Sequence, residues 1–349
     1  MTTVAETARP RPHPLRAVLR GVGRAALRLL TRTSIGGERA LATPGPVIFA
    51  ANHVSTFDAV LIFLLLPPDT VFVGPGDFPL EQPGEWLVQH LGLIRMKRGA
   101  LDRDSLKQMA AVLKHGGRLA LFPEGGTWEK PIDDVKSGVA YLSQATGAQI
   151  VPIGLGGTYR AWDTLRALRR PAIRVRIGAP LPPVIVPADR RRRQDELQAA
   201  AVDLMARIYA LLPPETQAHY DYFARVRYEG RLMFDPPRPE SATVSFDALA
   251  ELVSKPNLFR PLHRVAQLPI EPFLHPGRFY PLGTMRLAAA SLLGAFAEGD
   301  FAAYLDYRLG EDKADRVRAA LRAIIARIDA PGPGSARVAF AVAVTEPPD

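Results

Sequence analysis

The sequence predicts an α/β fold in which a mostly parallel mixed sheet is flanked by helices. The first observation is that short runs of apolar and β-branched residues alternate with longer helical patterns from about residue 46 onward. Such alternation is typical of parallel strands joined by helices. The second is composition, because a chain of 349 residues that is 47% hydrophobic can bury a sizeable core. This length suits one large domain or two of moderate size.

The chain is expected to begin with a basic amphipathic helix inside a segment that spans residues 1–40. This segment holds eight arginines and two glutamates, and arginine recurs every fourth residue from Arg16 to Arg32. On a helix these arginines form one slowly drifting row, and apolar residues fill much of the remaining surface. Such a helix can lie in the headgroup region of an anionic membrane. The alternative is a terminal helix packed on the domain with its arginine edge in solvent.

The predicted sheet domain occupies residues 41–212. Its strands are expected where apolar or β-branched residues run together, at residues 47–51, 70–74, 93–97, 118–122, 150–155 and 172–178. Helices are expected where the pattern becomes helical, at residues 56–66, 84–91, 103–114, 136–146 and 189–212. The pair Pro213-Pro214 marks the end of this domain.

Residues 213–349 are expected to form a mainly helical C-terminal extension. Helical patterns cover residues 287–309 and 311–329, and residues 337–344 alternate between apolar and other side chains like a strand. This half contains no catalytic motif and no internal repeat. The sequence therefore indicates neither the role of this extension nor the oligomeric state of the protein.

Several kinds of chemistry are excluded by residues that the sequence lacks. There is no cysteine, which excludes disulfides, cysteine-ligated zinc, iron–sulfur clusters and thiol catalysis. The seven histidines show no metal-ligand spacing, so no metal is expected. The glycine-rich phosphate loop and the G-x-S-x-G elbow of serine hydrolases are also absent. The net charge of +9 favours partners that bear phosphate, but no nucleic-acid-binding motif accompanies it, and nucleic acid is not an expected partner.

No apolar run approaches the length that a membrane-spanning helix requires, which is roughly 18–20 residues. The N-terminus also lacks the pattern of a secretory signal. We therefore expect a cytoplasmic protein that associates peripherally with the inner face of an anionic membrane.

The stretch NHVSTFD, residues 52–58, lies between two apolar runs. Ser55 followed by an acid three residues later matches a capping box at the start of a helix. In the simplest interpretation Ser55 caps the helix, Asp58 stabilises its first turn, and His53 only ends a strand. The functional interpretation requires His53 and Asp58 to meet. Positions five apart on a helix point about 140° from each other, so they meet only if His53 precedes the helix and Asp58 lies in its first turn.

A His53–Asp58 pair would be suited to proton transfer. The carboxylate could accept one imidazole N–H, fix the tautomer and stabilise the imidazolium, which leaves the other ring nitrogen to take a proton from a substrate hydroxyl. Ser55 and Thr56 lie close enough in sequence to suggest a Ser–His–Asp triad instead, although the elbow motif is absent.

Three further segments follow predicted strands or lie within one: GLIRMKR at residues 92–98, FPEGGT at 122–127 and VPIGL at 151–155. Together with NHVSTFD, and in this order, they resemble the four sequence blocks of the glycerolipid acyltransferase family, which includes bacterial 1-acyl-glycerol-3-phosphate acyltransferase. The resemblance covers roughly residues 44–181. It implies an O-acyltransferase that moves a fatty acyl group from a thioester to a hydroxyl of a lysophospholipid or glycerolipid.

The resemblance also implies roles for individual residues. His53 would be the general base and Asp58 its orienting partner, and no acyl-enzyme would form. Acyl-CoA or acyl carrier protein would be the donor, a lipid would be the acceptor, and no other cofactor would be needed. The residues expected to bind substrate are Asn52, Arg98, Glu124, Gly125 and Thr127, with Arg98 as the natural phosphate contact.

The third segment departs from the family pattern, which commonly continues with Thr or Ser and then Arg. Here Gly126 intervenes and Trp128 follows Thr127, so one cation at the acceptor phosphate is missing. A different lyso-lipid, or an alcohol without phosphate, is then an alternative acceptor. Two other functions stay open: a non-catalytic lipid-binding protein that retains the acyltransferase fold, and a triad hydrolase.

Overall fold

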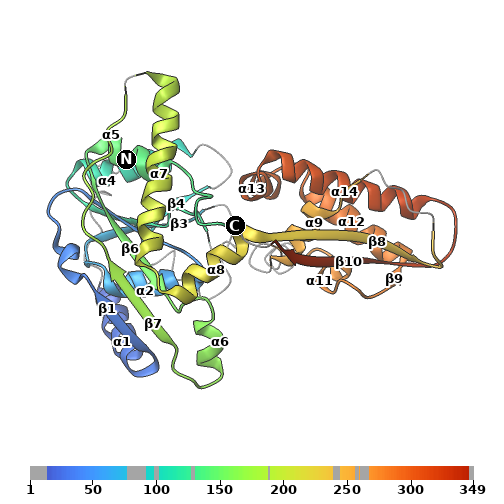
Figure 1. The fold of residues 1–349 in the computed structure, drawn as a ribbon, viewed down its shortest axis with the longest axis horizontal. Coiled ribbons are helices and arrows are strands. Elements are labelled where there is room, and N and C mark those ends of the chain that lie inside the picture. Colours follow the sequence, from blue (N-terminus) through green and yellow to red (C-terminus); the bar gives the residue numbers. More distant parts are fainter. Residues whose placement is uncertain are drawn as a thin grey trace. The chain divides into compact units, whose positions relative to one another are not determined.

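The computed structural model describes residues 14–76, 92–97, 102–126, 130–187, 189–238, 244–255, 259 and 267–345. It divides the chain into two compact units. The first consists of Met1–Met96 with Asp102–Ala224, and the second of Lys97–Leu101 with Arg225–Asp349. The first unit therefore continues to Ala224, beyond the domain end placed at residue 212 from the sequence. Figure 1 shows the helices and strands of each unit.

The first unit is built on a seven-stranded sheet in the order β1-β7-β6-β2-β5-β3-β4. Its strands are β1 (Arg32–Gly36), β2 (Val47–Ala51), β3 (Thr70–Pro75), β4 (Ile94–Met96), β5 (Arg118–Leu121), β6 (Gln149–Gly156) and β7 (Ala172–Ile177). All neighbours run parallel except β6 and β7, which are antiparallel. The predicted mostly parallel mixed sheet is thereby confirmed. The edge strand β1 was not predicted, because RTSIG lacks an apolar run.

Helices cover both faces of this sheet. They are α1 (Pro14–Leu30), α2 (Thr56–Leu65), α4 (Arg103–Lys114), α5 (Gly138–Thr146), α6 (Ala161–Arg166), α7 (Arg190–Leu211) and α8 (Pro214–Arg225), with a 3₁₀ turn η1 (Glu38–Ala42). Ile48 and Ala50 of β2 pack on the side of α4, α5 and α7, whereas Val47, Phe49 and Ala51 pack on the side of α1 and α2. The predicted helix at residues 84–91 lies outside the described residues.

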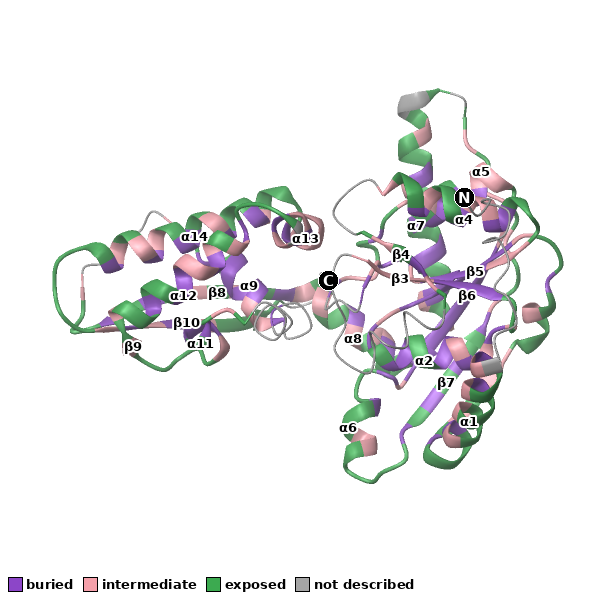
Figure 2. Cartoon of the chain, turned by 180° about the vertical axis from the view of Figure 1, so that it is seen from behind, coloured by how far each residue is buried: buried purple, intermediate pink, exposed green. Residues whose placement is uncertain are grey.

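The central strands are buried on both faces, as Figure 2 shows by colour. Every residue of β2 is buried, which is the pattern of a parallel strand covered by helices on either side. Within the sheet, β2 lies between β5 and β6 and runs parallel to both. The carboxyl ends of these three strands therefore meet at one edge, where open α/β sheets place their ligands. The loops that carry NHVSTFD and FPEGG leave the sheet at this edge.

The first arginines of the α1 row face the domain, whereas Arg28 and Arg32 are exposed, so the row is divided between the two arrangements considered from the sequence. Arg16 and Arg20 are buried. Arg16 Nη2 donates to the backbone oxygen of Thr70 at 3.1 Å, Arg24 Nε donates to that of Leu64 at 2.7 Å, and Arg20 also bonds to the oxygen of Leu66. The last carbonyls of a helix have no partner within it and carry partial negative charge. Arg20 and Arg24 therefore satisfy the C-terminal end of α2, and Arg16 holds the start of β3.

The second unit combines helices with a small antiparallel sheet. Its strands, in the order β8-β10-β9, are β8 (Val226–Asp235), β10 (Ser335–Val344) and β9 (Tyr280–Pro281). Its helices include α9 (Asp247–Ser254), α11 (Glu271–Leu274), α12 (Leu282–Ala295), α13 (Asp300–Leu309) and α14 (Glu311–Asp329). The single helix expected over residues 287–309 is two, because the chain turns before α13 at Gly299, whose φ is +84°. In the part of the chain that is described, no helix has both the length and the apolar character needed to cross a bilayer.

Candidate active site

The turn between β2 and α2 has the local structure that the sequence predicts. Ser55 is the N-cap of α2, and its hydroxyl oxygen accepts a hydrogen bond from the backbone N–H of Phe57 at 3.2 Å. Asp58 completes the capping box by accepting from the backbone N–H of Ser55 at 2.8 Å. His53 precedes the helix and Asp58 lies in its first turn, which is the arrangement that brings the two side chains together.

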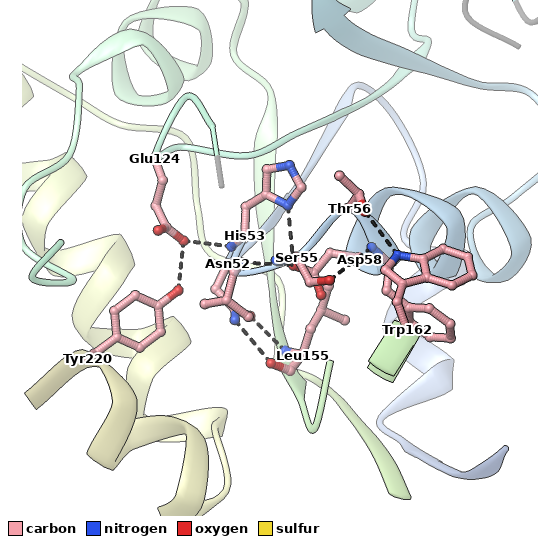
Figure 3. Close-up of polar contacts among 11 residues, drawn as sticks. Asn52, His53, Ser55, Thr56, Asp58, Glu124, Leu155, Trp162 and Tyr220 are labelled. Carbon is pink, nitrogen blue, oxygen red and sulfur yellow. Dashed lines mark hydrogen bonds and ion pairs between the residues drawn. The ribbon is translucent and has the colours of Figure 1, made fainter. Parts of the chain in front are cut away.

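One oxygen of Asp58 collects three donors. Its Oδ2 accepts from the backbone N–H groups of Val54 and Ser55, each at 2.8 Å, and it lies 3.2 Å from Nδ1 of His53 (Figure 3). Because an ionised carboxylate only accepts, Nδ1 carries the proton in this contact. The Nε2 atom of the neutral ring is then the basic one, and it makes no hydrogen bond within the described part of the chain. Asp58 is fully buried, whereas the His53 side chain is 13% exposed.

The loop after β5 fixes the imidazole from a second direction. The ring of Phe122 stacks on that of His53, with centroids 3.8 Å apart and planes inclined by 10°. Gly125, expected to bind substrate, has a φ of +76°, and its N–H donates to the carbonyl oxygen of Phe122 at 3.0 Å. This left-handed conformation favours glycine and lets the chain turn sharply beside the histidine.

Glu124 lies behind His53 and contacts the protein itself. Its side chain is fully buried. Its Oε1 accepts from the backbone N–H of His53 at 2.6 Å and from the hydroxyl of Tyr220 at 2.9 Å (Figure 3). Burial raises the pKa of Glu124 to about 8, against the opposing effects of the two hydrogen bonds and of Lys130. Glu124 therefore supports the backbone of the histidine, and its contact with the acceptor stays a prediction.

Asn52 holds two strand ends together. Its side chain is fully buried, and its Nδ2 donates to the backbone oxygen of Leu155 at 3.0 Å. The backbone N–H of Leu155 donates back to Asn52 Oδ1 at 2.7 Å. Both polar atoms of the Asn52 side chain are thus paired with β6, and its contact with substrate stays a prediction. The other two residues expected to bind substrate, Arg98 and Thr127, lie outside the described residues, as does Trp128.

Trp162 of α6 was not anticipated from the sequence. Its indole N–H donates to the hydroxyl of Thr56 at 2.9 Å, and its ring meets Phe57 edge-on at 5.1 Å. The side chain is 38% exposed, so it forms a partly open wall at the start of α2. Neither Trp162 nor Tyr220 carries a local sequence signal, because each reaches the site from about a hundred residues away along the chain.

This arrangement suits proton transfer to a basic Nε2 and offers no protein nucleophile among its described residues. The Ser55 hydroxyl is buried and caps α2, and the Thr56 hydroxyl accepts the indole N–H of Trp162. Neither is hydrogen-bonded to His53. The described residues also contain no group of three or more potential metal-binding side chains.

The buried Glu124 gives a prediction for stability against pH. Its pKa is about 8 in the folded protein, against an ordinary value of 4.5. Between pH 4.5 and pH 8 the folded protein keeps the Glu124 proton that the unfolded chain has lost. The stability that Glu124 contributes is therefore fully present below about pH 4.5 and is lost as the pH rises through about 8. The effect is on the order of a few kcal/mol. Urea unfolding at a series of pH values should show that the free energy of unfolding declines with pH in the wild type and depends less on pH in Glu124→Gln. An equal dependence on pH in both proteins would contradict the prediction.

Comparison with known proteins finds relatives of the part of the chain that contains this site. Residues 32–156 match the model of the Acyltransferase family. The chain is 33% identical over 141 residues to a 1-acyl-sn-glycerol-3-phosphate acyltransferase of Cocos nucifera, a match that covers 38% of this chain and 45% of the relative. It is 34% identical over 83 residues to a lyso-ornithine lipid O-acyltransferase of Pseudomonas aeruginosa, covering 24% of this chain and 31% of the relative.

A solved structure also matches, that of the 1-acyl-sn-glycerophosphate (LPA) acyltransferase PlsC from Thermotoga maritima. The match has a TM-score of 0.42 and 18% identity, and it covers 56% of this chain and 80% of that chain. The chain spans less than half the length of the two curated relatives named above. The family match includes β2, α2, the Phe122–Gly125 turn and β6, which together build the site. Residues 32–156 of the first unit thus resemble the acyltransferase family, and the resemblance to glycerolipid acyltransferases that the four segments predicted is confirmed.

Proposed function

We propose that this protein is an O-acyltransferase that moves a fatty acyl group from a thioester to a hydroxyl of a lysophospholipid or glycerolipid. The observation that carries the proposal is the His53–Asp58 contact, which leaves Nε2 of His53 as the basic nitrogen. Its occurrence in an acyltransferase domain supports direct attack by the acceptor. Both curated relatives named above are acyltransferases whose names specify glycerolipid or lyso-lipid acceptors.

In the proposed reaction, Nε2 of His53 takes the proton of the acceptor hydroxyl as its oxygen attacks the thioester carbonyl. Asp58 stabilises the imidazolium that forms and stays ionised. The tetrahedral intermediate then collapses, the carbon–sulfur bond breaks, and the leaving thiolate recovers the proton from His53. General-base assistance of this kind contributes about 10²–10⁴-fold. Holding hydroxyl and thioester together can contribute roughly 7–11 kcal/mol more.

The proposed acceptor class is the one that the two named relatives share. One relative is named for a phosphate-bearing acceptor and another for an ornithine lipid, and this chain lacks the arginine that commonly closes the third sequence block. A lyso-lipid with one free hydroxyl is common to both. We therefore propose the lyso-lipid class as acceptor, with acyl-CoA or acyl carrier protein as donor.

An acceptor screen tests this function. The purified protein is incubated with acyl-CoA or acyl carrier protein and with lysophosphatidic acid, lyso-ornithine lipid or lysophosphatidylcholine, and products are detected by mass. We expect a diacylated product with at least one acceptor. Thioester cleavage that releases free fatty acid at the same rate without acceptor would indicate a hydrolase. Lipid binding without any turnover would indicate a non-catalytic lipid-binding protein.

We also propose that the first unit meets an anionic membrane through the outward face of α1. Val18, Val22 and Leu29 recur at helical spacing on this face, and each is more than half exposed. Leu168 is 97% exposed on the neighbouring loop, which Arg170 ties to α1 by donating to the backbone oxygen of Arg28 at 3.0 Å. Basic side chains surround this apolar surface, which is the composition of an interfacial membrane site. The exposed arginines among them are Arg28, Arg32, Arg169 and Arg170.

Aspartate on this face should weaken membrane binding. We expect the double variant Val18→Asp, Val22→Asp to bind vesicles of phosphatidylglycerol and phosphatidylcholine at least about tenfold more weakly, because two apolar contacts are lost and two like charges are added. Sedimentation with vesicles measures this. Val202→Asp on α7, another exposed valine of the same unit, is the matched control and should bind like the wild type. Equal binding by all three proteins would contradict this location.

A further inference from the structure

Tyr220 connects α8 to the candidate active site although it lies outside the residues that match the family model. Its side chain is 1% exposed and packs with Val54 and Leu212. Its hydroxyl donates to Oε1 of Glu124 at 2.9 Å. A buried tyrosine hydroxyl needs a hydrogen-bond partner, and the partner here is the carboxylate that also holds the backbone of His53.

The hydrogen bond from Tyr220 belongs to a chain that ends at the histidine backbone. The same Oε1 of Glu124 accepts from the N–H of His53 at 2.6 Å. The imidazole is held separately, by Asp58 at Nδ1 and by the ring of Phe122. Phe122 and Glu124 lie on one loop, so a shift of Glu124 would move both the backbone of His53 and the ring stacked on its side chain.

We propose that Tyr220 is a positioning residue, which holds Glu124 so that His53 presents Nε2 to the acceptor hydroxyl. The proposal rests on the proposed function, in which His53 is the general base. Tyr220 acts through Glu124 and does not touch the substrate. Displacement of reacting groups by about 1 Å can cost about 10²-fold in rate, so support of this kind has a measurable effect.

The groups that face Glu124 determine how the hydrogen bonds from Tyr220 through Glu124 to His53 respond to pH. They are the N–H of His53, the hydroxyl of Tyr220, Lys130 and Asp58. The two hydrogen bonds and Lys130 lower the pKa of Glu124, whereas burial and Asp58 raise it. Both donors are held best by the carboxylate form. Loss of the Tyr220 hydroxyl should therefore raise the pKa of Glu124 and leave more of it protonated at neutral pH.

The variant Tyr220→Phe separates positioning from packing because it keeps the ring and removes only the hydroxyl. We expect kcat to fall about tenfold to a hundredfold, with a smaller change in KM. The acidic limb of the kcat–pH profile should move to higher pH. Tyr209→Phe is the matched control, because it removes a tyrosine hydroxyl that donates to the carboxylate of Asp221 at an exposed position, and it should match the wild type. A Tyr220→Phe profile superimposable on that of the wild type would overturn the proposal.

Glu124→Gln provides the internal test, because it removes the titrating group. In that background Tyr220→Phe should shift the profile no further, and a shift of the same size as in the wild type would contradict the route through Glu124. NMR of ¹³C-carboxyl-labelled glutamate gives a measurement that needs no activity. The Glu124 signal should titrate at higher pH in Tyr220→Phe than in the wild type. If no acceptor is acylated but this shift is seen, the proposed function fails and the Tyr220–Glu124 linkage stands. If acylation occurs and the shift is absent, only the role of Tyr220 fails.

Discussion

Replacing His53 by alanine should lower the rate of acyl transfer by about two to four orders of magnitude, the range typical of losing a general base. The imidazole is the group whose Nε2 is left to accept the acceptor proton, since Nδ1 contacts Asp58. The fold should survive the change. Asp58 keeps its hydrogen bonds from the backbone N–H groups of Val54 and Ser55, and the His53 side chain is partly exposed.

The measurement is steady-state turnover with the best donor and acceptor from the screen, beside thermal unfolding of the same samples. His115→Ala is the matched control, because His115 is an exposed histidine on the surface beyond α4 and should be dispensable. Added imidazole should restore part of the lost rate, since truncation opens space beside Phe122 where a free base fits. Wild-type turnover by a folded His53→Ala protein would show that the general-base mechanism is wrong.

Local sequence patterns predicted much of the fold because the corresponding interactions are local. VIFAA forms a strand at residues 47–51 because every side chain in it tolerates burial on both faces of a sheet. The helices at Arg103–Lys114 and Glu311–Asp329 match the predicted ranges, since each has a continuous helical pattern. The capping box of Ser55 and Asp58 involves residues three apart, so it too could be predicted from the sequence.

The contacts that the sequence did not predict connect distant segments. The Pro213-Pro214 pair suggested a boundary, yet α8 begins at Pro214, where proline suits the first turn of a helix. This helix returns Tyr220 to a carboxylate 96 residues away. Likewise, the arginines of α1 were expected to face water or lipid headgroups. The unpaired carbonyls at the end of α2 instead provide acceptors for Arg20 and Arg24, which no pattern within α1 could reveal.

Replacing Asp58 by asparagine should also lower the rate by about 10²–10⁴-fold, since the analogous change in Ser–His–Asp enzymes costs about 10⁴-fold. Asparagine can still accept from the N–H groups of Val54 and Ser55 through its oxygen. The same oxygen stays next to Nδ1 of His53, but it has no negative charge to stabilise the imidazolium. Asp58→Ala should be damaging in a different way, because two buried N–H groups lose their acceptor at about 1–3 kcal/mol each.

The two Asp58 variants together separate chemistry from folding. Urea unfolding should show a small loss of stability for Asp58→Asn and a larger one for Asp58→Ala, whereas turnover should fall steeply in both. Asp163→Asn is the matched control, because Asp163 is an exposed carboxylate on α6 that pairs with Arg166. Because Asp58 acts through the imidazole, adding Asp58→Asn to His53→Ala should cause no further loss of rate. Losses that multiply in the double variant would show that Asp58 assists the reaction independently of His53.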